Sequence, residues 1–188
     1  MSYERHNIKL VTKDLQKFVI NTPVLRFDII DSLCNCNVFF KCENFQHTGS
    51  FKYRAAINAI KNMPVEFRQT GVITHSSGNF AHALAKAAYE LKIPCHIVMP
   101  NNTPNFKKSS VLSYTKNVVE CESNLEAREF TTSEIFKNKN LYFIHPSNNM
   151  DVILGNSTCA AEFINDYPNL DSIFSPIGGG GLIAGTSI

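Results

Sequence analysis

Short apolar runs alternate with helical patterns along most of this sequence, and this alternation constrains the fold more than any other feature. Residues 71–74 form one such run, and in residues 79–91, which follow, alanine and leucine recur on one face of a helix. Strand, helix and strand in this order make a crossover connection, which joins parallel strands. The sequence therefore predicts an α/β fold with a largely parallel sheet. The predicted strands are residues 38–40, 71–74, 94–99, 117–120, 141–144 and 172–176, and the predicted helices are residues 50–63, 79–91, 104–113, 125–136 and 152–166.

Composition and charge exclude several classes of protein. Of 188 residues, 44% are hydrophobic and 18% are charged, which is typical of a folded globular chain. The net charge is +2, too small to indicate a nucleic-acid or membrane partner. No apolar stretch approaches the roughly 20 residues that cross a bilayer, and charges interrupt the first twenty residues, where a signal peptide would need an apolar core. We therefore expect a cytoplasmic protein with no nucleic-acid partner and no membrane association.

The cysteines give no sign of a metal site. Six are dispersed through the chain, and Cys34 and Cys36 are separated by a single residue. That spacing is too short for the usual paired ligands of a zinc site. We expect reduced and mostly buried thiols, and no bound metal.

Four consecutive glycines follow the last predicted strand and precede a helical pattern: Gly178, Gly179, Gly180 and Gly181. Ligands of parallel sheets bind where the carboxyl ends of strands turn into helices. Without Cβ atoms, successive backbone N–H groups can approach an anion closely. The helix that begins there adds the favourable end of its dipole. These glycines therefore predict a phosphate site rather than a flexible loop.

Two further turns join a predicted strand to a predicted helix. In one, Ser76 and Ser77 can either cap the helix or hold a carboxylate at its start, and the sequence leaves these alternatives even. In the other, Ser50 can cap the helix, which places Lys52 in its first turn. The helix dipole disfavours a cation there, and a destabilised ammonium makes a lysine a better nucleophile. Lys52 is therefore a candidate nucleophile rather than a surface charge.

A nucleophilic lysine, a hydroxyl-rich turn and a glycine-rich anion site are together what pyridoxal phosphate (PLP) requires. The sequence resembles the fold-type II PLP enzymes of the serine racemase and threonine (serine) dehydratase family over residues 22–188. The match rests on Thr-Gly-Ser-Phe-Lys-Tyr-Arg at residues 48–54, His-Ser-Ser-Gly-Asn at residues 75–79 and the glycines at residues 178–181. Three motifs in the family's order are specific, whereas any one alone would be weak.

The resemblance implies a role for each matched residue. Lys52 would form the Schiff base with PLP and then remove the Cα proton of the substrate. Ser77 would face Cα from the opposite side, as in the racemases, although hydroxyaspartate dehydratases also have a serine there. Arg128 aligns with an arginine that approaches the substrate in racemases, although a surface arginine on a helix is the slightly favoured alternative. The implied catalytic residues are Lys52 and Ser77, the cofactor-binding residues are Lys52, Phe51, Asn79, Gly178, Gly179, Gly180, Gly181 and Leu182, and the substrate-binding residues are Ser76, Ser77, Gly78 and Arg128.

The resemblance also implies the architecture of fold-type II, or tryptophan synthase β-like, enzymes: two domains with open, twisted, mainly parallel sheets in three layers. Residues 1–69 would begin the large cofactor domain and residues 70–146 would form the small domain. Residues 147–188 would return to the large domain, which would be truncated at its carboxyl end. The group that binds the pyridine nitrogen of PLP, and the divalent-cation site of the racemases, would lie beyond Ile188.

The implied reaction is PLP-dependent dehydration of a small β-hydroxy amino acid, L-threonine or L-serine, to a 2-keto acid and ammonia, with serine racemisation as a further activity. A full-length protein would be a homodimer. The alternative is a truncated, catalytically incompetent protein that acts only by binding or association. Departures from the family pattern suggest a changed substrate or relaxed constraint. Phe80 and His82 replace a histidine and a glutamine, Ala55 replaces a glycine, and Asn156 and Ser157 stand within a usual Gly-Gln-Gly-Thr turn.

Overall fold

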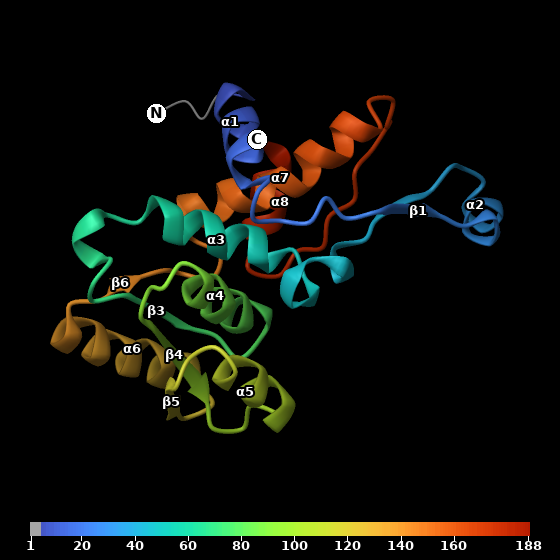
Figure 1. Cartoon of the computed structure of the whole chain (residues 1–188). Coiled ribbons are helices and arrows are strands. Elements are labelled where there is room, and N and C mark those ends of the chain that lie inside the picture. The colour runs from blue at the N-terminus through green and yellow to red at the C-terminus, as the bar shows by residue number, and fades with distance from the viewer. Residues whose placement is uncertain (1–4) are drawn as a thin grey trace.

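A four-stranded parallel sheet forms the centre of the structure. The computed structural model describes residues 5–188, so the first four residues of the expected domain 1–69 lie outside the described residues. The strands lie in the order β5-β4-β3-β6, and all three pairings are parallel, as the alternation of strands and helices predicts (Figure 1). Their bounds are β3 Val72–His75, β4 Cys95–Pro100, β5 Asn117–Cys121 and β6 Tyr142–Phe143.

Helices cover both faces of this sheet and give it three layers. Helices α4 (Asn79–Glu90) and α5 (Asn105–Leu112) lie on one face, and α6 (Leu125–Lys139) lies on the other. Successive strand residues alternate between the two layers: Val72 packs in the cluster on the α4 side, whereas Ile73 packs in the cluster on the α6 side. This alternation follows from the period of two in a strand, and burial on both faces explains why the central strands β3 and β4 are largely apolar.

A second group of helices packs beside the sheet. Helix α3 (Lys52–Asn62) lies between α4 and α7 (Met150–Asp166), and α7 also packs against α1 and α8. The crossing of α3 and α7 is close because of Gly155, where a Cβ atom would stand 2.7 Å from the Cα atom of Ala55. Outside the arm described below, the other helical elements of residues 5–188 are α1 Arg5–Leu15, α8 Gly181–Ser187 and the short 3₁₀ turns η1 Glu43–Phe45, η2 His47–Gly49 and η3 Val65–Phe67.

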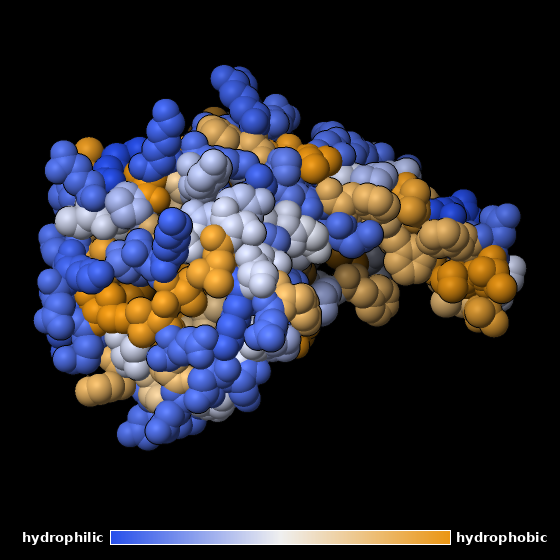
Figure 2. Space-filling model, turned by 60° about the horizontal axis from the view of Figure 1, so that its bottom comes forward, coloured by the Kyte–Doolittle hydropathy of each residue, from blue (hydrophilic) through white to orange (hydrophobic). Residues whose placement is uncertain are grey.

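An arm projects from this body (Figure 1). Strands β1 (Val24–Arg26) and β2 (Phe39–Lys41) pair antiparallel and carry helix α2 (Asp28–Cys34) between them. The strand predicted near residues 38–40 therefore exists, but it belongs to this hairpin and not to the parallel sheet. Figure 2 shows largely apolar residues at the tip of the arm, where Ile29 and Leu33 are 71% and 78% exposed.

Two expectations from the sequence need correction, and some elements were not predicted. Residues 172–176 form no strand, because no described strand lies beside them to accept their backbone hydrogen bonds. The cysteines are free, as expected, but they are not mostly buried: Cys95 is buried, whereas Cys34 and Cys36 are exposed on the arm. Helices α1 and α2 and strand β1 were not predicted. Among residues 5–188, no helix is long and apolar enough to span a membrane.

Candidate active site

Lys52 is the first residue of α3, and its side chain is half-buried. Its Nζ atom donates a hydrogen bond to the carbonyl oxygen of Pro146, at 2.9 Å. The same atom lies 5.2 Å from the centroid of the Phe51 ring and 5.6 Å from that of Phe80. Burial lowers the pKa of the Lys52 amine. A larger fraction of this amine is therefore neutral and nucleophilic than in an exposed lysine.

The turn before Lys52 is strained. Thr48 has a φ of 61°, in the left-handed region that a β-branched residue rarely adopts. Ser50 does not cap α3 as expected, because the cap position is Phe51 and no side chain caps the helix. Instead the Ser50 hydroxyl is buried and has no hydrogen-bond partner among the described residues. Strained backbone and unpaired buried polar groups are both more frequent at functional sites than elsewhere.

The residues that follow β6 form a fourth turn, which was not identified from the sequence. It contains Pro146, which accepts the Lys52 hydrogen bond, and Ser147, which packs under the glycine loop. A Cβ atom on Gly179 would stand 2.6 Å from the Oγ atom of Ser147. The signal that could have identified this turn was its position, since it follows the predicted strand 141–144 at the carboxyl edge of the sheet.

The glycine loop leads into α8 from an irregular segment rather than from a strand. Gly180 has a φ of 81°, a conformation that glycine adopts without strain. Gly181 is buried, and a Cβ atom there would stand 3.1 Å from the carbonyl oxygen of Ser147. Since α8 is only seven residues long, the loop itself, and not a helix dipole, is the feature that suits an anion.

Exchanging Gly179 for alanine tests the contact between the loop and the turn. We expect Gly179→Ala to destabilise the PLP-free protein by about 1–3 kcal/mol, because the new methyl group overlaps Ser147. A chain of this length should then lose several degrees in Tm, at about 2–4 °C per kcal/mol. Gly178→Ala is the matched control, since a Cβ atom there meets nothing within 4 Å. Adding Ser147→Gly should restore most of the loss; a Gly179→Ala protein as stable as Gly178→Ala would contradict the packing.

The serine turn joins β3 to α4. Its serines do not cap the helix, because Gly78 is the cap residue and no side-chain hydrogen bond is made there. The Oγ atom of Ser76 instead accepts a hydrogen bond from the N–H of Gly78, at 3.3 Å. Ser77 is half-buried, and Asn79, the first residue of α4, is exposed. The helix start therefore keeps free N–H groups, which favours the carboxylate-binding alternative.

Two histidines link the serine turn to the Pro146 turn. His75 ends β3 immediately before Ser76, and its ring lies 5.8 Å from that of His145, with the rings nearly perpendicular at 89°. Burial lowers the pKa of His75, and the charges of His145 and Arg128 lower it further. Arg128 is half-buried near this edge of the sheet, and its Nε atom donates to the carbonyl of Asn124 at 3.3 Å. The positive charge of Arg128 therefore acts on His75, the residue that precedes the serine turn.

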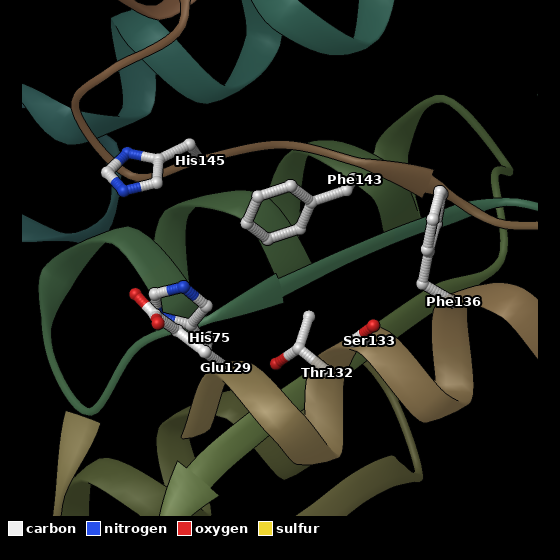
Figure 3. Close-up of a pocket in the computed structure, with 7 residues that line it drawn as sticks. All are labelled: His75, Glu129, Thr132, Ser133, Phe136, Phe143 and His145. Atoms are coloured by element: carbon white, nitrogen blue, oxygen red, sulfur yellow. The ribbon is translucent and has the colours of Figure 1, made fainter. Parts of the chain in front are cut away.

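A cavity of about 310 Å³ opens beside these histidines, between α6 and the carboxyl ends of β3 and β6 (Figure 3). Glu129 is the acidic residue of its wall, and the other lining residues are His75, Thr132, Ser133, Phe136, Phe143 and His145. A second cavity, of about 270 Å³, lies between the base of the arm and α7, and Phe51 and Leu182 both line it. Among residues 5–188, no group of three or more histidine, cysteine or acidic side chains is arranged to hold a metal ion.

The three motifs therefore meet around the Pro146 turn. Lys52 contacts Pro146 directly, the glycine loop packs on Ser147, and the serine turn is linked through the histidine rings. The sequence model for pyridoxal-phosphate dependent enzymes matches residues 15–188, which is nearly the whole chain. This chain belongs to the pyridoxal-phosphate dependent enzyme family. The cofactor expected from the sequence is accordingly PLP.

Individual relatives fall in the racemase and dehydratase branch of this family. The serine racemase of Dictyostelium discoideum is 41% identical over 182 residues, covering 97% of this chain and 56% of the relative. Its crystal structure superposes with a TM-score of 0.91 at 40% identity, covering 96% of this chain and 59% of that one. A beta-hydroxyaspartate dehydratase of Paracoccus denitrificans (strain Pd 1222) is 40% identical over 174 residues, covering 93% of this chain and 55% of the relative.

The crystal structure of a T.th. threonine deaminase has a TM-score of 0.87 at 28% identity, covering 98% of this chain and 59% of that one. The fold-type II architecture is thereby confirmed. This chain spans about half the length of the curated relatives it matches.

The residues around Lys52 fit PLP. Both polar atoms of the Asn156 amide are buried without a partner among the described residues, and Nδ2 lies 3.3 Å from where a Gly181 Cβ atom would stand. The glycine loop is therefore backed by an unpaired amide donor, which suits a phosphate. Lys52 offers an amine of lowered pKa for the cofactor aldehyde. PLP supplies an aldehyde that condenses with amines and a ring that accepts electron density from Cα.

Proposed function

We propose that Lys52 holds PLP, and that the enzyme to which this chain belongs dehydrates a small β-hydroxy amino acid, L-serine or L-threonine, to a 2-keto acid and ammonia. The observation that carries this proposal is the hydrogen bond of 2.9 Å from Lys52 to the turn that also supports the glycine loop. Through this turn the Lys52 amine and the glycine loop lie close to each other at the carboxyl edge of the sheet, where ligands of such folds bind.

The proposed roles follow from position. The Lys52 amine, freed when substrate replaces it, removes the Cα proton, and its half-buried setting favours the neutral form that can accept one. The N–H groups at the start of α4 and the hydroxyls of Ser76 and Ser77 hold the substrate carboxylate. Phe80, which is 2% exposed, excludes water on one side of Lys52.

Further assignments complete the proposed site. Asn79 and Leu182 contact the cofactor together with Phe51, and Gly178–Gly181 bind its phosphate. Arg128, on α6, contacts the substrate. Residues 70–146 form the small domain, supported by the four-stranded sheet that lies entirely within them, and residues 1–69 and 147–188 belong to the large domain. A cytoplasmic location and a homodimer are part of the same proposal.

Product analysis tests the reaction. The full protein, loaded with PLP, should release 2-keto acid from L-serine or L-threonine at a rate that rises with enzyme concentration. A PLP absorbance band distinct from that of the free cofactor, without product from either amino acid, would instead favour a binding protein. If the protein causes no change in the absorbance of PLP, the proposal as a whole is contradicted.

Ser77 separates dehydration from racemisation. If Ser77 returns a proton to Cα from the side opposite Lys52, Ser77→Ala should lower D-serine formation by about 100-fold or more, the usual contribution of a positioned acid. Keto-acid release from the L-amino acid should fall much less, since Lys52 alone removes its proton. Ser76→Ala is the comparison, because it should raise the KM for the L-amino acid equally whether D-serine or keto acid is measured. Equal losses of both products in Ser77→Ala would remove Ser77 from the racemisation step.

A further inference from the structure

The His145 side chain organises the turn that holds Lys52. Its Nδ1 atom accepts two backbone hydrogen bonds, from the N–H of Ser147 at 3.1 Å and from the N–H of Asn148 at 2.8 Å. Between His145 and Ser147 lies Pro146, whose carbonyl accepts the Lys52 hydrogen bond. Ser147 in turn packs under the glycine loop. One imidazole nitrogen therefore supports both halves of the proposed cofactor site.

The ring itself is fixed by its neighbours. It stands nearly perpendicular to the His75 ring, at 5.8 Å and 89°, and nearly perpendicular to the Phe143 ring, at 6.2 Å and 87°. Figure 3 shows His145 at one end of the cavity, with Phe143 beside it and His75 below it. Edge-to-face packing of this kind holds a ring in one orientation. The Nδ1 atom is thus aimed at the turn.

Accepting two N–H groups requires a lone pair on Nδ1, so the proton of the neutral ring is assigned to Nε2. Protonation of Nδ1 would turn the acceptor into a donor that faces two other donors. Burial lowers the pKa of His145, and the Lys52 charge lowers it further, whereas Glu129 of α6 opposes them. The other titratable groups facing this ring are His75 of β3 and, through it, Arg128 of α6.

We propose that His145 is a positioning residue for the cofactor site: through its unprotonated Nδ1 it shapes the turn that orients Lys52 and supports the glycine loop, and PLP binding therefore depends on its protonation state. The proposal rests on the proposed function of Lys52. Because the neutral ring is the competent form, binding is complete above the ordinary histidine pKa of about 6.5 and is lost as the pH falls through the lowered pKa of the folded protein.

Two variants of His145 separate its acceptor from its bulk. Asparagine places an amide oxygen at the position of Nδ1 and does not titrate, whereas leucine fills the space without an acceptor. We expect His145→Leu to weaken PLP binding by about tenfold or more, because two N–H groups lose their partner. His145→Asn should stay within about threefold of the wild type. His96→Asn is the matched control, since His96 is a histidine 8% exposed on β4, outside the turn.

The pH profile gives a readout that simple destabilisation would not produce. PLP affinity is measured by absorbance titration between pH 5 and 8, and folding at each pH is checked by circular dichroism. The wild type and His96→Asn should lose affinity toward low pH, whereas His145→Asn should lose distinctly less. Parallel profiles for the wild type and His145→Asn, or unchanged affinity in His145→Leu, would overturn the proposal. Failure of the wild type to bind PLP at any pH would instead overturn the proposed function.

Discussion

Replacing Lys52 with alanine should abolish the visible absorbance that forms when the protein is mixed with PLP. The amine of Lys52 is the group in this site that can condense with the cofactor aldehyde, and burial lowers its pKa so that more of it is neutral than in an exposed lysine. Turnover should fall by about 100-fold or more, because the variant loses its proton acceptor as well as its covalent link. Absorbance spectroscopy during a PLP titration measures the first effect directly.

Lys61→Ala is the matched control for this experiment. Lys61 lies on the same helix, α3, but it pairs with Asp14 near the opposite end. Its loss should leave the PLP absorbance unchanged. Borohydride reduction followed by peptide mass analysis then identifies the modified lysine. A label that persists at the same level in Lys52→Ala, on another lysine, would show that the cofactor is held elsewhere.

Much of the fold could be predicted because its pattern is local. In the parallel sheet the central strands β3 and β4 are buried on both faces, as Val72 and Ile73 illustrate, so a short apolar run is sufficient to identify them. The start of α4 was predicted at Asn79, where the structure has it. The glycine loop could be found for the same reason, since four adjacent residues carry the whole signal. Their assignment to PLP depends on the family match and still awaits experiment.

The remaining features depend on contacts that are distant in the sequence. Residues 172–176 have a strand-like composition, but a strand needs a partner, and composition does not report whether one is present. The arm has the opposite character, since β1 and β2 are only three residues each and pair with one another alone. Pro146 and His145 carry no motif of their own. Their importance follows from the approach of Lys52, which lies 94 residues away from Pro146 in the sequence.

The stability of the fold also depends on contacts between residues that are distant in the sequence, and Arg54 makes several of them. It follows Lys52 by two residues, is 0% exposed, and is bound by two carboxylates from other parts of the chain. Glu43 of η1 accepts from Nε and Nη2 at 2.8 and 2.9 Å, and Glu162 of α7 accepts from Nη1 and Nη2, both at 2.7 Å. Lys41 of β2 also pairs with Glu162, at 3.0 Å. One guanidinium thus joins α3, α7 and the base of the arm.

Replacing Arg54 with methionine should therefore destabilise the protein by about 3–5 kcal/mol, because two largely buried carboxylates lose their common partner. Urea unfolding of the PLP-free protein measures the loss, and Arg68→Met, at an exposed arginine, is the matched control. Arg54→Lys should fall between them, since an ammonium keeps the charge but cannot bind both carboxylates in bidentate fashion. Adding Glu43→Gln to Arg54→Met should recover part of the loss, because Lys41 still pairs with Glu162 whereas Glu43 has lost its cation. If Arg54→Met and Arg68→Met unfold alike, the ion network does not hold the Lys52 helix in place.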